Sequence, residues 1–170
     1  AAAGDENLRI IGQDTTFAVT TDDGPVEITR RMTSCALNKG FLQPMVPVEG
    51  VTPVGEIEVL NALNDPGTVV IDMREIEWFA DATIPNAKNI PYTEVAGRLD
   101  ELGCTKKSGG WDCANAKRVI AFCNGAVCPQ SPAAIKAMHR EGFPMSQVMY
   151  YCGGMLSWKA LGLTTVEGDF

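Results

Sequence analysis

Six cysteines stand out among the 170 residues of the chain, because a thiolate is a nucleophile, a metal ligand and a redox centre. Two of them, Cys123 and Cys128, lie five positions apart in the segment 122–132, which reads FCNGAVCPQSP. A loop that brings its two ends together can place such a pair within bonding range, so that one sulfur attacks another. The segment therefore predicts thiol chemistry.

The elements on either side of this segment decide whether Cys123 is reactive. Residues 118–123 are a continuous apolar run that predicts a buried strand, and residues 131–140 predict a helix. Ligands of open α/β sheets bind at the carboxyl ends of strands, and a loop entering a helix aims free backbone N–H groups at one point. We expect these groups to lower the pKa of Cys123 and to bind substrate. The substrate-binding residues predicted in this way are Asn124, Gly125, Ala126, Val127, Gln130 and Ser131. The opposing interpretation is that Cys123 is an inert, buried strand residue.

The roles of the two loop thiols stay open at this point. In the assignment that we favour, because of its strand-end position, Cys123 carries a persulfide and Cys128 resolves it, releasing reduced sulfur and leaving a disulfide. In the second assignment, Cys128 is the carrier and Cys123 assists. In the third, Cys128 is a small residue that only fills the loop.

The remaining four cysteines divide into a pair and two single residues. Cys104 and Cys113 flank a polar loop of eight residues and are expected to form a structural disulfide if the protein is exported. Cys152 follows the next predicted strand, where it is either a third thiol near the site or a core residue. Cys35 reaches the site only if the N-terminal extension folds over it. The spacings lack paired Cys-x(2–4)-Cys knuckles, so no metal or other cofactor is predicted.

Strands and helices alternate from residue 52 onward. Apolar runs predict strands at 68–72, 87–91, 118–123 and 147–151, and helical spacing predicts helices at 52–63, 75–81, 94–102, 131–140 and 155–160, with a polar loop at 104–115. This alternation predicts an α/β domain over residues 51–170, with a central, mainly parallel sheet flanked by helices. Residues 1–50 predict an N-terminal extension, made of a hairpin and a covering segment, with too few apolar residues for its own core.

The composition narrows the class of protein. With 45% hydrophobic and 21% charged residues, the chain is neither disordered nor collagen-like, and no apolar run is long enough to span a membrane. Its net charge of −7, without a basic block, argues against nucleic-acid and membrane partners. The small residues at positions 1–5 look like the stretch left after a signal peptide is removed, so we expect a periplasmic or otherwise exported protein, with a cytoplasmic location as the alternative.

Three motifs between residues 52 and 163 carry a resemblance to the rhodanese homology domain, the sulfurtransferase fold. The first is Asp72-Met73-Arg74 after a strand, followed by TIPNAKNIP at 83–91; the second is Cys123 at its strand end; the third is GGMLSWKALG at 153–162. The resemblance implies a rhodanese-like α/β fold with Cys123 as the nucleophile. The chain departs from the family where Thr83 and Asn86 replace His and Gly. Its loop is also two residues longer than the family's Cys-x-x-Gly-x-Arg-Ser and lacks the arginine.

The resemblance implies a rhodanese-like sulfurtransferase that carries sulfane sulfur as a cysteine persulfide and passes it to a thiol or other nucleophile. Its partner would be a small sulfur-containing substrate or a protein persulfide or thiol, and the missing arginine favours polysulfide or a protein persulfide over thiosulfate as donor. The alternatives are a thiol-disulfide oxidoreductase or redox sensor that uses Cys123 and Cys128, and a non-enzymatic binding module.

Four further residues have expected places around this site. Asp72 and Arg74 are candidate accessory residues, and we favour a structural ion pair at the strand end over a catalytic role. Trp78 and Trp158, at helical positions, are expected in the core.

Overall fold

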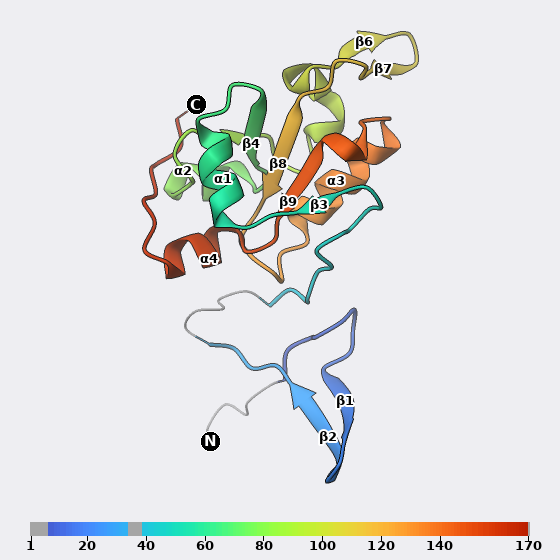
Figure 1. Cartoon of the computed structure of the whole chain (residues 1–170), viewed down its shortest axis with the longest axis vertical. Coiled ribbons are helices and arrows are strands. Elements are labelled where there is room, and N and C mark those ends of the chain that lie inside the picture. The colour runs from blue at the N-terminus through green and yellow to red at the C-terminus, as the bar shows by residue number, and fades with distance from the viewer. Residues whose placement is uncertain (1–6, 34–38, 170) are drawn as a thin grey trace.

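A five-stranded parallel sheet forms the centre of the protein, for which the computed structural model describes residues 7–33 and 39–169 (Figure 1). In spatial order the strands are β3 (Thr52–Pro53), β9 (Val148–Tyr151), β8 (Arg118–Phe122), β4 (Thr68–Asp72) and β5 (Lys88–Asn89), and all neighbours are parallel. The carboxyl ends of the strands therefore meet at one edge of the sheet. This confirms the predicted α/β architecture with a mainly parallel sheet.

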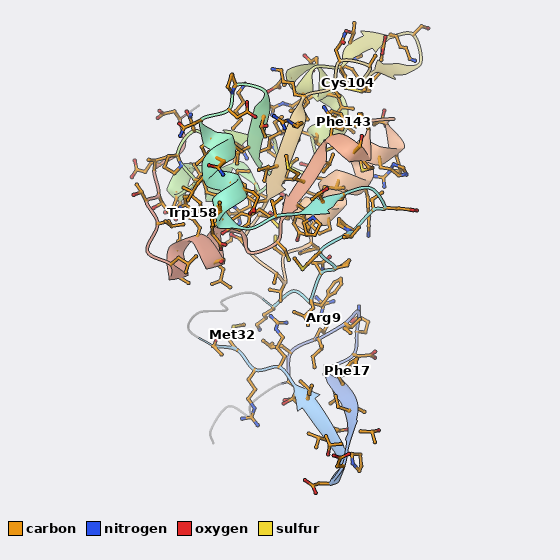
Figure 2. All side chains as sticks on the ribbon, in the orientation of Figure 1. Arg9, Phe17, Met32, Cys104, Phe143 and Trp158 are labelled. Carbon is orange, nitrogen blue, oxygen red and sulfur yellow. A yellow bond between two sulfur atoms is a disulfide. The ribbon has the colours of Figure 1, made fainter. Side chains whose placement is uncertain are left out.

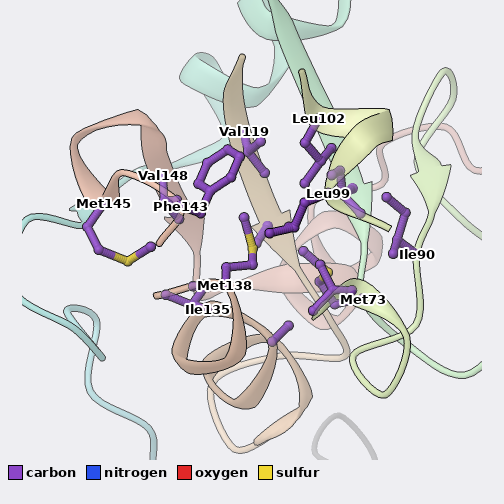
Figure 3. Packing of buried hydrophobic residues seen from close by; sticks show 14 of the residues in the cluster. Met73, Ile90, Leu99, Leu102, Val119, Ile135, Met138, Phe143, Met145 and Val148 are labelled. Carbon is purple, nitrogen blue, oxygen red and sulfur yellow. The ribbon is translucent and has the colours of Figure 1, made fainter. Parts of the chain in front are cut away.

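Helices cover both faces of the sheet. One face packs against α1 (Glu56–Leu63) and α4 (Gly154–Ala160), and the other packs against α3 (Gln130–Arg140) and the short 3₁₀ helices η1 (Val95–Gly97) and η2 (Leu99–Leu102). Strand β8 shows why both layers form, because its side chains alternate between the two cores. Val119 belongs to the core under α3, which Figure 3 shows with Ile135 and Met138, whereas Ile120 belongs to the core under α1.

The predicted elements need correction at three places. Thr52–Pro53 is edge strand β3 instead of the start of a helix, and α1 begins only at Glu56. An edge strand tolerates proline, because one side of it needs no N–H group. The helix predicted at 94–102 is instead η1 and η2, on either side of Arg98. The predicted loop at 104–115 contains a small hairpin, β6 (Thr105–Lys107) and β7 (Gly110–Asp112).

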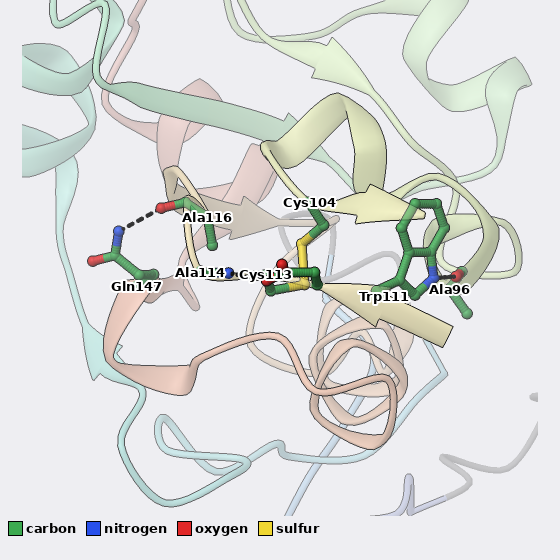
Figure 4. Close-up of a disulfide and its surroundings, with 8 residues drawn as sticks. Ala96, Cys104, Trp111, Cys113, Ala114, Ala116 and Gln147 are labelled. Atoms are coloured by element: carbon green, nitrogen blue, oxygen red, sulfur yellow. Dashed lines mark hydrogen bonds between the residues drawn. A yellow bond between two sulfur atoms is a disulfide. The ribbon is translucent and has the colours of Figure 1, made fainter. Parts of the chain in front are cut away.

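The small hairpin ends in a disulfide between Cys104 and Cys113, the two cysteines that the sequence analysis pairs (Figure 4). Trp111 on β7 donates a hydrogen bond from its ring nitrogen to the carbonyl oxygen of Ala96, at 3.0 Å. Cys113 precedes β8, whereas the Cys123 loop follows it, so the disulfide lies at the end of the sheet opposite to that loop.

The N-terminal segment forms a hairpin that projects away from the sheet (Figure 1). Its strands, β1 (Thr16–Thr21) and β2 (Gly24–Thr29), pair antiparallel, and Figure 2 shows Phe17 on β1 far from Trp158 in the core. Residues 39–51 then run toward the sheet without regular secondary structure, and the Gln43 N–H donates to the Ala126 carbonyl oxygen at 2.9 Å. This segment therefore contacts the cysteine loop, while the division of the chain at residue 51 stays a prediction.

Two short helices complete the described chain, α2 (Ile76–Asp81) after β4 and η3 (Met145–Gln147) before β9. Within residues 7–33 and 39–169, no helix has both the length and the apolar character needed to cross a membrane.

Candidate active site

The cysteine loop, residues 123–129, joins the end of β8 to the start of α3 and is hydrogen-bonded to the first turn of α4. The N–H groups of Met155 and Leu156 donate to the carbonyl oxygens of Cys123 and Asn124, at 3.0 and 2.8 Å. Gly154 makes this approach possible, since its φ is +53° and a Cβ there would overlap the Cys123 carbonyl oxygen. The glycines of the 153–162 motif thus fix the backbone of the loop.

Cys123 lies inside the protein, at the predicted strand end. Its side chain is 1% exposed. The Ser131 N–H donates to the Cys123 sulfur at 3.4 Å, and the Cys123 thiol donates to the Cys128 carbonyl oxygen at the same distance. Burial raises the pKa of Cys123 well above its ordinary value, and the neighbouring Cys128 raises it further. The expectation that the loop lowers the pKa of Cys123 is therefore wrong, because one N–H group does not compensate for the loss of water.

Cys128 is the thiol that the loop favours as a thiolate. Its pKa is lowered to about 7, mainly by a hydrogen bond with the Cys123 thiol, against an opposing effect of burial. The backbone N–H groups of Asn124 and Gln130 contribute, and so does the positive charge of Arg74. The loop therefore favours the thiolate at Cys128 over the thiolate at Cys123.

Asp72 and Arg74 form a buried ion pair at the end of β4, as favoured from the sequence. Their side chains are 0% and 2% exposed, and the guanidinium makes two hydrogen bonds to the carboxylate, Nε to Oδ1 at 2.9 Å and Nη2 to Oδ2 at 2.6 Å. Arg74 Nη1 also donates to the side-chain oxygen of Asn124 at 3.2 Å. Thr83, which stands where the family has histidine, donates its hydroxyl to Asp72 at 2.9 Å. The pair thus connects β4 to the cysteine loop.

A pocket of about 300 Å³ opens beside Cys128. It is lined by Trp78, Tyr92, Asn124, Cys128, Pro129, Gln130 and Ala133. Cys128 is the one thiol among these lining residues, and it is only 2% exposed. No charged side chain of the described chain belongs to this lining.

Cys152 lies beside the loop thiols. It directly follows β9, and Cys123 directly follows β8, whose last residues pair in register as Phe122 and Tyr151. Burial raises the pKa of Cys152, which is partly buried against the core under α3. Burial also raises the pKa of Tyr150, and the nearby thiols of Cys123 and Cys152 raise it further. Cys152 therefore lies next to the site, and its surroundings favour the protonated thiol.

The other predicted site residues have varied positions. Asn124 and Gln130 line the pocket, Ser131 donates to Cys123, and the Ala126 carbonyl accepts the hydrogen bond of the N-terminal segment. Gly125 and Val127 are buried within the loop. Cys35 lies outside the described residues.

Two aromatic residues of the pocket are missing from the sequence-based site. Trp78 was expected in the core but is 52% exposed, because α2 buries Phe79 instead. Tyr92 directly follows the TIPNAKNIP stretch at 83–91, where no sequence pattern distinguishes a pocket residue from a core residue. The sequence offers one signal that Trp78 is exposed: it is next to Phe79 in a helix so short that only one of the two aromatic side chains can face the core. No group of three histidine, cysteine or acidic side chains in the described part of the chain is placed to hold a metal ion.

Comparisons with known proteins agree with this fold. A family model described as rhodanese-like domain matches residues 57–161. An HTH-type transcriptional regulator of Mycobacterium tuberculosis is 32% identical over 111 residues, covering 65% of this chain but only 43% of the regulator. Two crystal structures share the fold. A protein from Bacillus halodurans has a TM-score of 0.54 at 19% identity, over 68% of this chain and 76% of its own. A thiosulfate sulfurtransferase from Pseudomonas aeruginosa has a TM-score of 0.54 at 22% identity, and the match covers 70% of this chain and 21% of that protein's chain.

Proposed function

Because the chain belongs to the rhodanese-like domain family, we propose that it is a sulfurtransferase that carries sulfane sulfur as a persulfide on Cys128. The observation that carries the proposal is a thiol with a pKa of about 7 in the wall of a pocket. A thiolate is the attacking species in sulfur exchange, and a pKa near the ambient pH combines a large ionised fraction with good nucleophilicity. Among the three assignments left open by the sequence, this favours the second, with Cys128 as carrier and Cys123 assisting it.

The reaction takes place in two displacements at sulfur. The Cys128 thiolate attacks the outer sulfur of a donor R–S–SH, so that an S–S bond to Cys128 forms, the donor S–S bond breaks, and R–S⁻ leaves. An acceptor thiolate then attacks the outer sulfur of the Cys128 persulfide, takes that sulfur, and returns Cys128 as a thiolate. The covalent intermediate predicts ping-pong kinetics. No net oxidation occurs, because each S–S bond that breaks is replaced by another.

The surroundings of Cys128 support both steps. Hydrogen bonds from Cys123 and from the N–H groups of Asn124 and Gln130 stabilise negative charge on the Cys128 sulfur, which is the leaving group in the second step. The Cys104–Cys113 disulfide supports an oxidising compartment such as the periplasm for the protein. The partners remain those expected from the sequence, a small sulfur compound or a protein persulfide or thiol.

Site-resolved mass spectrometry after exposure to hydrogen polysulfide tests the proposal. The wild-type chain is expected to gain 32 Da, the mass of one sulfur atom, on Cys128, and the Cys123→Ala variant is expected to gain it more slowly at the same residue. Cys128→Ala is expected to lose the adduct. The matched control is Cys152→Ala, which keeps it. An adduct that persists in Cys128→Ala and disappears in Cys123→Ala would reverse the assignment.

A thiol-disulfide oxidoreductase is the second candidate, because the Cys123 thiol lies against Cys128 and donates to its carbonyl oxygen at 3.4 Å. In that function an external disulfide is reduced while Cys123 and Cys128 are oxidised to a bond between them, without a sulfur adduct. A non-reducing peptide map distinguishes the two functions. A reversible Cys123–Cys128 link that forms without any persulfide would favour the oxidoreductase.

A further inference from the structure

We infer that the pocket beside Cys128 selects, as its sulfur donor, an organic hydropersulfide whose organic group is apolar and uncharged. The inference rests on the proposed function and names the substrate class of the same site. It follows from two properties of the pocket: the aromatic residue at its edge, and the absence of any charged side chain of the described residues from its lining.

Trp78 gives the pocket an apolar contact surface. Its side chain is 52% exposed, whereas Phe79, the next residue in α2, is 5% exposed and anchors the helix in the protein. The indole therefore stands at the pocket on a helix held in place from the other side. Together with Tyr92, Pro129 and Ala133 it offers ring faces and aliphatic carbons to a ligand. A large exposed aromatic at a pocket is a surface that an apolar group can bury.

Among residues 7–33 and 39–169, no cationic side chain lines the pocket to bind an anionic donor. The guanidinium of Arg74 is the positive group that acts on Cys128, but Asp72 neutralises it, and its remaining bonds go to Asn124 and the Ala82 carbonyl oxygen. Two of the loop N–H groups are also engaged, since that of Cys128 donates to the Gly125 carbonyl and that of Ser131 to Cys123. A sulfonate would thus lose its water without gaining a partner.

In the step that the pocket would favour, the Cys128 thiolate attacks the outer sulfur of R–S–SH, and the apolar group leaves as R–S⁻, which takes a proton from water. The Cys128 persulfide holds the transferred sulfur. Atoms and electrons balance as in the general reaction, because one S–S bond replaces another, and no oxidant or reductant is consumed.

A matched pair of donors tests the inference. We would compare 2-phenylethyl hydropersulfide with 2-sulfonatoethyl hydropersulfide, which share the reacting sulfurs and differ in the terminal group. The rate constant for forming the Cys128 persulfide, followed by mass spectrometry at low donor concentration, is expected to be at least roughly tenfold higher for the phenyl donor. Equal rates, or a faster sulfonate donor, would overturn the inference but leave the proposed function standing. An absence of adduct with both donors would overturn the proposed function and the inference with it.

Variants at α2 show whether Trp78 is responsible. Trp78→Ala is expected to reduce the phenyl-to-sulfonate rate ratio severalfold, and Trp78→Phe is expected to restore most of it. Ile76→Ala is the control, since Ile76 is 44% exposed on the same helix and is not part of this pocket. An unchanged ratio in a folded Trp78→Ala protein, or the same loss in Ile76→Ala, would overturn the role of the indole.

Discussion

Replacing each partner of the Asp72–Arg74 pair in turn separates its structural role from its effect on the nucleophile. Both residues are buried, and each replacement leaves the other without its partner. Removing one member of a buried ion pair costs about 3–5 kcal/mol of stability. We therefore expect Asp72→Asn and Arg74→Met to lower the free energy of unfolding by similar amounts. A structural role alone predicts that the two variants also behave alike at Cys128.

The electrostatic role predicts opposite effects on Cys128. Arg74→Met removes the cation that lowers the pKa of Cys128 and leaves the Asp72 carboxylate, so this pKa should rise; Asp72→Asn leaves the cation alone, so it should fall. Arg74 is the smallest of the contributing causes, so we expect each midpoint to move from about 7 by less than it does in Cys123→Ala, which removes the largest cause.

The assay is alkylation of Cys128 by iodoacetamide between pH 5 and 9, resolved by peptide mass spectrometry. Urea unfolding of the same proteins gives their stabilities and shows that the measurements are made on folded chains. The double variant Asp72→Asn/Arg74→Met serves as the control, because it removes both charges and should recover part of the stability. Midpoints that move in the same direction in both single variants would refute the electrostatic argument.

Three further changes test other parts of the site. Cys123→Ala removes the main cause of the low pKa of Cys128, so the alkylation midpoint should move up from about 7, and an unmoved midpoint would contradict a role of Cys123 in lowering this pKa. Gly154→Ala should slow persulfide formation and lower stability by at least about 1 kcal/mol, because a side chain would push the Cys123 carbonyl away, whereas Gly109→Ala, at an open turn, is the comparison. Cys104→Ala/Cys113→Ala should lower the free energy of unfolding by about 2.5 kcal/mol and leave the alkylation rate of Cys128 unchanged, since the disulfide lies at the other end of the sheet; a slower rate would reveal coupling.

The elements with a strong local signal could be predicted from the sequence. A strand that is buried on both faces carries apolar side chains at successive positions, so it can be recognised as a continuous apolar run. Two such runs are the adjacent parallel strands Thr68–Asp72 and Arg118–Phe122. The segment 52–63 was harder, since Thr52–Pro53 has the chemistry of a helix start, and only pairing with distant Tyr150 makes it a strand. Pairing across about 97 residues leaves no local trace.

The location of the thiols was predictable, but their acidity was not. The sequence places Cys123 at a strand end before a helix, and the structure agrees. The direction of its pKa depends on how much water reaches the sulfur and on which sulfur the neighbouring N–H groups face, and both depend on how the loop between β8 and α3 folds. The role of Trp78 was hidden for a similar reason, because helical spacing does not tell which side of a short helix meets the core.

The chain holds sulfur in two oxidation states at opposite ends of one sheet, with a disulfide between Cys104 and Cys113 at one end and free thiols at Cys123, Cys128 and Cys152 at the other. A strong dithiol added during purification to protect the proposed nucleophile therefore risks reducing the disulfide. Air preserves the disulfide but exposes the free thiols to sulfenic acid formation. Handling under argon without dithiol, followed by counting of titratable thiols in denaturant, would keep both states and allow each preparation to be checked before its chemistry is measured.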